Sequence, residues 1–145
     1  MMRAHPVTGV GIGVFRSQML RYAPAWYDGP PFMAHSAYVS LAAEMGILGL
    51  VLFLAVLVST YRSLERVYRM KSAPRLVTQA AVALQAALLG SSISIAFISA
   101  EHHEYLWLII FLSMCLAPFA KWRRTLRQAP AGERTLGAGV AFAEV

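Results

Sequence analysis

Three long runs of apolar residues divide the chain, and none of them contains a charged residue. They cover residues 45–61, 76–100 and 105–120. A helix that crosses a membrane needs roughly 20 apolar residues. The first run therefore needs Ala42 and Ala43, or an Arg62 side chain extended toward water, to complete a span. The pattern predicts an all-α membrane protein with three transmembrane helices.

The charged residues between these runs predict the orientation of the chain. Residues 62–75 carry five Lys or Arg side chains against one Glu, and the tail 121–145 carries five Lys or Arg. The turn 101–104 carries two Glu and no Lys or Arg. Because basic segments stay in the cytoplasm, we place both basic segments there. Residues 1–44 and the acidic turn then share the outer face, and the tail is expected to be disordered.

Composition agrees with a membrane protein. Of the 145 residues 58% are apolar and only 14% are charged, which is too apolar for a soluble domain of this size. Lys and Arg number 13 against 7 acids, but they are confined to short blocks, which is typical of membrane topology rather than nucleic-acid binding. The single cysteine, Cys115, excludes a disulfide within the chain.

The outer segment is predicted to be an irregular loop with short interfacial helices. Pro6 begins a Pro-x-x-Gly-x-Gly sequence, whose glycines allow unusual backbone angles and the close approach of another chain or ligand. The glycine spacing does not fit a dinucleotide-binding loop, and both a plain turn and a phosphate cradle remain open. Residues 15–22 favour a short helix, and the prolines and glycine of residues 24–31 prevent regular structure after it.

His35 is the candidate catalytic residue. His35, Tyr38 and Ala42 fall at helical spacing, so we expect the imidazole and the Tyr38 ring to point the same way from one helix face. Histidine suits proton transfer from a hydroxyl because its pKa lies close to neutral pH. The alternative is a histidine that only anchors the chain at the membrane interface.

Arg16 and Arg21 are candidates for binding an oxyanion, since guanidinium groups make bidentate, charge-assisted hydrogen bonds to phosphates. The alternative is a pair of solvated loop charges. Gly46 and Gly49 lie where an outer helix enters the membrane span. They are interpreted as structural residues that let the helix bend or pack closely.

The turn 101–104 contains two adjacent histidines between two glutamates. A helical zinc site needs two histidines four residues apart on one face, so this spacing does not fit. We therefore predict no metal site, and interpret these side chains as polar caps of an outer hairpin.

His35 and Ser36 are followed by nine residues and then by Gly46-x-x-Gly49. This pattern, with the Pro-x-x-Gly-x-Gly sequence before it, resembles the signature of the O-antigen ligase and polymerase family of bacterial membrane glycosyltransferases. The resemblance implies transfer of a glycan from undecaprenyl-pyrophosphate to an acceptor hydroxyl, on lipid A-core or on a protein, at the periplasmic face of the inner membrane. It further implies that His35 activates the acceptor, that arginines bind the pyrophosphate, and that no cofactor is needed. Arg16 and Arg21 are our candidates for these arginines, and Tyr38, expected on the same helix face as His35, is a further candidate for substrate binding.

Two alternatives to a ligase remain. One is a polysaccharide polymerase of the same superfamily, and the other is a non-catalytic three-span protein that is a remnant or a partner of a ligase.

No signal peptide precedes Met45, although the segment before it must cross the membrane. Family members have many more spans, so we expect this chain to be the C-terminal part of a larger helical bundle and to be inactive by itself.

Overall fold

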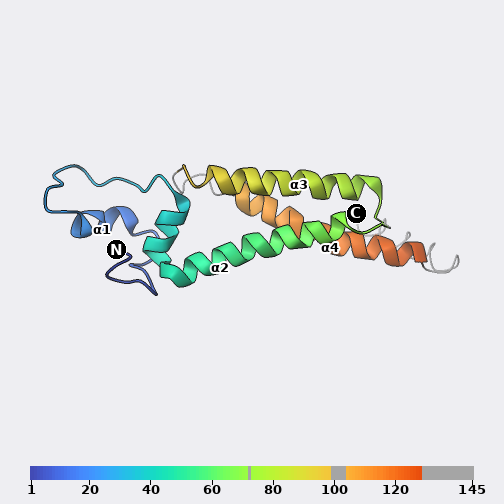
Figure 1. Ribbon diagram of the computed structural model, residues 1–145, viewed down its shortest axis with the longest axis horizontal. Coiled ribbons are helices and arrows are strands. Elements are labelled where there is room, and N and C mark those ends of the chain that lie inside the picture. Colours follow the sequence, from blue (N-terminus) through green and yellow to red (C-terminus); the bar gives the residue numbers. More distant parts are fainter. Residues whose placement is uncertain (72, 99–103, 129–145) are drawn as a thin grey trace, which may run out of the picture.

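The computed structural model describes residues 1–71, 73–98 and 104–128, and its regular structure is entirely helical within these ranges (Figure 1). This confirms the predicted all-α class. The turn's residues 101–103 and the tail from residue 129 lie outside the described residues. The helices are α1 (Phe15–Tyr22), α2 (Ala37–Tyr68), α3 (Arg75–Ser94) and α4 (Glu104–Gln128).

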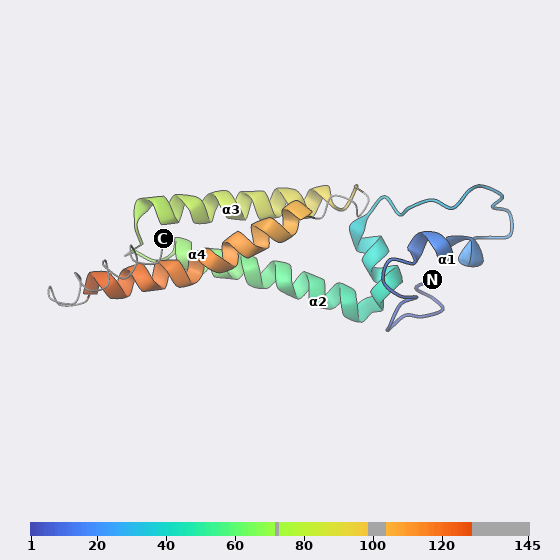
Figure 2. The same cartoon turned by 180° about the vertical axis from the view of Figure 1, so that it is seen from behind.

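Three of these helices, α2, α3 and α4, are long and apolar enough to cross a membrane. Each packs against the other two, and α4 lies across the pair formed by α2 and α3 (Figure 2). The prediction of three membrane-spanning helices is confirmed by length and composition.

The helix ends differ from the ends of the apolar runs. Helix α2 continues past residue 61 to Tyr68, because Glu65 and Arg69 form an i,i+4 ion pair that favours further helix. Helix α3 ends at Ser94, before residue 100, where the Ile95 and Ala96 amides bond to α3 carbonyls and form a closing turn. An apolar run indicates which residues can lie in a membrane, whereas local hydrogen bonds determine where the helix ends.

The bundle core consists of two clusters of buried side chains. One surrounds Leu57, Leu88 and Leu106, and the other surrounds Leu64 and Val67 near the loop between α2 and α3. Only 22% to 33% of each candidate span is buried within this chain. Most of the apolar surface of the spans therefore faces lipid or other helices, which is consistent with a fragment of a helical membrane protein.

Helix α2 is broken at Gly46, whose φ of 68° and ψ of −168° are not helical. Tyr38 and Phe53 show how sharp the break is. In a straight helix, 15 residues would separate them by about 22 Å, yet their ring centroids lie only 6.0 Å apart. The first part of α2 therefore folds back toward the second part (Figure 1).

The broken backbone is completed by the glycine-rich segment of residues 6–11. The Val10 and Gly11 amides donate to the carbonyls of Ala43 (3.0 Å) and Glu44 (2.9 Å), and the Ile47 amide donates to the Pro6 carbonyl (2.9 Å). Each of these bonds pairs a backbone group near the break that would otherwise lack a helical partner. We call this contact between residues 6–11 and 43–47 the glycine lock.

The glycine lock requires glycine on both sides. Gly9 and Gly46 each have a φ of 68°, a region that side chains disfavour. A Cβ on Gly46 would collide with the Val7 carbonyl, and a Cβ on Gly9 would collide with the Glu44 carbonyl. The plain-turn and phosphate-cradle interpretations both miss this arrangement, because the segment's glycines approach α2 itself.

We expect Gly46→Ala to destabilise the protein by at least about 1–2 kcal/mol, from its backbone conformation alone, with a further cost from the collision at Val7. Gly90→Ala is the matched control. Gly90 lies within α3 with open space around its Cα, so alanine there should stabilise by about 0.5–1 kcal/mol. Thermal unfolding of the detergent-solubilised protein measures both. Equal unfolding midpoints for the two variants would contradict the lock.

Candidate functional site

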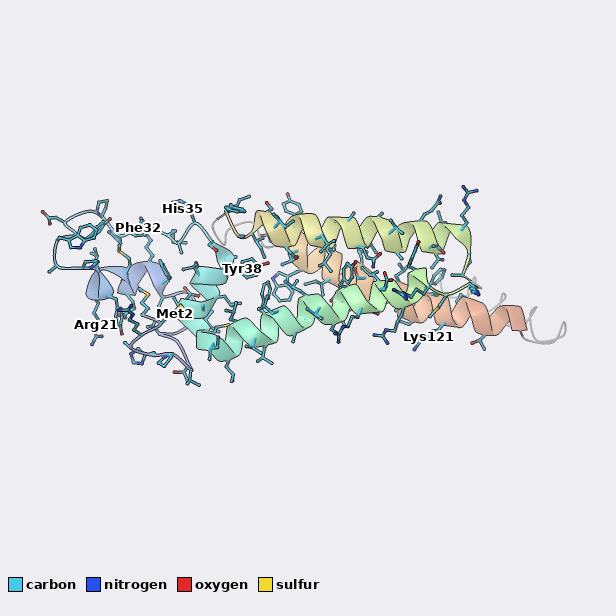
Figure 3. The ribbon with its side chains drawn as sticks, viewed as in Figure 1. Met2, Arg21, Phe32, His35, Tyr38 and Lys121 are labelled. Atoms are coloured by element: carbon cyan, nitrogen blue, oxygen red, sulfur yellow. The ribbon has the colours of Figure 1, made fainter. Side chains whose placement is uncertain are left out.

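The predicted site residues all lie at the end of the molecule that holds α1 and the start of α2 (Figure 3). Lys121 and the basic loop after α2 lie at the opposite end (Figures 1 and 3). The structure thus separates His35 from the basic loop after α2 and from Lys121 along the length of the bundle, as the topology prediction requires.

His35 lies outside the helix, and the prediction that it shares a helix face with Tyr38 is wrong. Helix α2 begins at Ala37, and Ser36 before it is extended, with a φ of −157° and a ψ of 122°. Serine is favoured at this position just before a helix. Residues before Ser36 are not helical, so helical periodicity does not apply to them. His35 is exposed on the last residues of the loop.

Two hydrogen bonds fix the start of α2 next to His35. The Ala37 amide donates to the carbonyl of Ile95 (2.9 Å), and the Tyr38 hydroxyl donates to the carbonyl of Ser92 (2.8 Å). Both acceptors lie at the end of α3. The imidazole is thus exposed but carried on backbone that is anchored two residues later.

Tyr38 faces the bundle, whereas His35 lies on the side of the loop (Figure 3). The Tyr38 ring packs edge-on against the Phe53 ring, with 6.0 Å between the ring centroids. Phe53 packs in the same way against Trp107 of α4, with 6.3 Å between the centroids. The expectation that Tyr38 and His35 point the same way is therefore also wrong. This geometry gives the Tyr38 hydroxyl a role in holding the α2 start on α3.

Arg16 and Arg21 lie on α1, whose bounds agree with the predicted helix over residues 15–22. Both side chains are exposed. Five helical positions separate them by about 140° around the helix, so they do not form one clamp on a single face. Arg21 and His35 lie apart in Figure 3, with α1 between them. The structure brings the three residues to one end of the molecule but not into mutual contact.

Glu44 is a residue of this region that the sequence interpretation did not select. Its two carboxylate oxygens accept hydrogen bonds from the backbone amides of Gly13 and Phe15, both at 2.9 Å. These amides lie at the N-terminus of α1, where the helix has no side-chain cap of its own. The available signal was an acid immediately before a membrane span, directly beside the Gly46 motif.

Two apolar cavities flank the glycine lock. One of about 290 Å³ lies between α1 and the first part of α2. The other, of about 280 Å³, lies between the glycine-rich segment and the α2 residues that follow the break. Their linings suit hydrocarbon. The first includes Phe15, Met19, Tyr22, Phe32 and Val39, and the second includes Val7, Ile12, Met45, Leu48 and Leu52.

Among the residues that the structure describes, no three His, Cys, Asp or Glu side chains lie close enough together to hold a metal ion. The Glu101-His102-His103 part of the acidic turn, for which the spacing argument was made, lies outside those residues.

One comparison with known proteins finds a match for this end of the molecule. Residues 1–54 match the O-antigen ligase family, and this match supports membership of the chain in the O-antigen ligase superfamily, as the histidine and glycine pattern predicted. The matched segment contains α1, His35, Glu44 and both sides of the glycine lock. No curated protein and no solved structure matches the chain.

We expect Tyr38→Phe to lower the stability of the protein by about 1 kcal/mol, because it leaves the Ser92 carbonyl without its donor while keeping the ring contact with Phe53. Tyr105→Phe is the control, since the Tyr105 side chain is 69% exposed. Thermal unfolding midpoints measure the difference. Identical midpoints for the two variants would show that the Tyr38 hydroxyl does not hold α2 on α3.

Proposed function

We propose that this chain is the C-terminal portion of an O-antigen ligase-like glycosyltransferase. It would move a glycan from undecaprenyl-pyrophosphate to an acceptor hydroxyl of lipid A-core or of a protein. The observation that carries the proposal is His35, exposed on an anchored loop within the segment that matches the ligase family.

In this reaction the acceptor hydroxyl oxygen attacks the anomeric carbon of the first donor sugar. The bond from that carbon to the pyrophosphate oxygen breaks, and undecaprenyl-pyrophosphate leaves with the bonding electrons. His35 takes the hydroxyl proton, which makes the oxygen a better nucleophile as the new glycosidic bond forms. An exposed imidazole on fixed backbone suits this task, because it is reachable by a bulky acceptor and its position is set in advance.

Arg16 and Arg21 are proposed to bind the donor's pyrophosphate. Their guanidinium groups would make charge-assisted hydrogen bonds to the phosphates of the bound donor. The two side chains point from different sides of α1, so each would contact a different part of the donor head. The apolar cavities beside α1 offer nearby surface for hydrocarbon.

The orientation follows from the distribution of charge. His35 lies at the end of the bundle opposite the basic loop and Lys121 (Figure 3), and basic segments stay in the cytoplasm. We therefore propose that the protein lies in the bacterial inner membrane with the His35 loop in the periplasm, where lipid-linked glycans are presented.

The first test is His35→Ala in the protein that carries this chain, in native membranes supplied with undecaprenyl-pyrophosphate-linked glycan and lipid A-core. We expect transfer to fall by roughly 100- to 10,000-fold, as for loss of a general base. His5→Ala is the control, because His5 is also exposed on the outer segment. Gel analysis of the acceptor measures transfer. Equal rates for both variants would exclude His35 as the base, and a ladder of lengthened donor would identify a polymerase.

We expect Arg16→Ala and Arg21→Ala each to raise the donor KM by roughly 10-fold, the effect of losing one charge-assisted hydrogen bond. Arg3→Ala removes the same charge from an exposed position outside α1 and should leave the KM unchanged. Initial rates across donor concentrations measure the effect. The same KM for Arg16→Ala and Arg3→Ala would remove Arg16 from the donor site.

A further inference from the structure

We propose that Glu44 is a positioning residue, whose carboxylate holds α1 in place and so sets where Arg16 and Arg21 meet the donor. The claim that Glu44 sets where the arginines meet the donor rests on the proposed function. The claim that Glu44 holds α1 in place rests only on its hydrogen bonds to Gly13 and Phe15, which lie 31 and 29 residues before it in the sequence.

The carboxylate bridges two backbone amides at once. Oε2 accepts from Gly13 and Oε1 accepts from Phe15, so both oxygens are used and the side chain is held in one orientation. Negative charge at the N-terminus of a helix is also stabilised by the helix dipole. Glu44 therefore serves α1 as the N-terminal cap that the Val14 side chain cannot provide.

Glu44 itself is held firmly. Its carbonyl accepts from the Gly11 amide, and the neighbouring Ala43 carbonyl accepts from Val10, both within the glycine lock. The Ala43 and Glu44 carbonyls thus fix residues 10 and 11, while the Glu44 side chain fixes residues 13 and 15. The chain from the lock to the first residue of α1 is bound to two adjacent residues of α2, and Glu44 makes three of these four hydrogen bonds.

Besides the Glu44 contact, α1 is held by the buried Met19 and by an edge-on contact between the His5 and Tyr22 rings, whose centroids are 6.4 Å apart. It is only eight residues long, and Met19 is its one buried residue. A helix of this length is marginal without tertiary contacts. Loss of the carboxylate contact should therefore loosen the whole helix, and both arginines would move with it.

The same contact decides which groups are left for the donor. The N-terminus of a helix is a ready site for phosphate, because its free amides point outward. At α1 the Phe15 amide already bonds to Glu44, as does the Gly13 amide just before the helix, and the Glu44 charge would also repel a pyrophosphate there. The anion is thereby directed to the arginine side chains rather than to the helix end.

The structural test is hydrogen exchange of residues 13–22 in the protein that carries this chain, purified in detergent, as wild type and Glu44→Gln. An amide side chain keeps the size of the carboxylate but loses its charge and presents one NH₂ group toward a backbone donor. We expect the Gly13 and Phe15 amides to exchange roughly 10-fold faster in the variant.

Glu65→Gln is the matched control. Glu65 also lies on α2 and also uses both oxygens, for Arg69 and Gln85, but at the other end of the bundle. It should leave exchange at residues 13–22 unchanged. Equal exchange of this segment in wild type and Glu44→Gln overturns the proposal.

The functional test is a donor titration of transfer in native membranes. We expect Glu44→Gln to raise the donor KM by roughly 10-fold with a much smaller change in kcat, because α1 carries the donor arginines and His35 lies outside it. In an Arg16→Ala, Arg21→Ala background, Glu44→Gln should add less than 2-fold, since the groups it positions are gone.

The outcomes separate the two proposals. Faster exchange with an unchanged KM overturns the positioning role, and full additivity with the arginine variants does so as well. Absence of transfer by wild type both to lipid A-core and to membrane proteins refutes the proposed function, while the exchange experiment still decides whether Glu44 holds α1.

Discussion

The arrangement of this end of the protein depends on one constraint, the pairing of backbone groups where α2 breaks at Gly46. A helix that is interrupted in or near a membrane exposes amides and carbonyls that must find partners. Here the partners come from residues 6–11, more than 30 residues earlier in the chain. The break exposes backbone groups on which the glycine-rich segment docks. The docked segment supplies the hydrogen-bond partners that these groups would otherwise lack.

His35 and α1 occupy their positions because of two separate anchors on the first part of α2. At its start, Ala37 and Tyr38 bond to carbonyls at the end of α3. At its end, the glycine lock and the Glu44 carboxylate hold the outer segment. The loop that carries His35 leaves from the first anchor, and the helix that carries the arginines leaves from the second. The relative placement of His35 and the two arginines is therefore set by the short helical piece between the anchors.

Sequence reasoning was reliable where local composition decides the outcome. The spans follow from apolar runs long enough to cross a bilayer, and α1 follows from residues 15–22 between glycine and proline. It was wrong to put His35 on a helix face with Tyr38, because helical periodicity was carried past Ser36, where the helix begins. It missed Glu44, since the amides that this carboxylate binds lie about 30 residues away and no local pattern connects them. The sequence predicted that the helix could bend at Gly46, but it did not predict that residues 6–11 dock on the bend.

The spacing of the family pattern has a mechanical interpretation. Nine residues lie between Ser36 and Gly46, and they form the helical piece that joins the two anchors. At 1.5 Å per residue this piece measures about 13 Å, and each added or removed residue would turn one anchor by about 100° relative to the other. Such a turn would point the Glu44 carboxylate away from Gly13 and Phe15 or move Tyr38 away from Ser92. The histidine and the glycines therefore need a fixed separation, because the helix between them sets both the distance and the angle between the two halves of the candidate site.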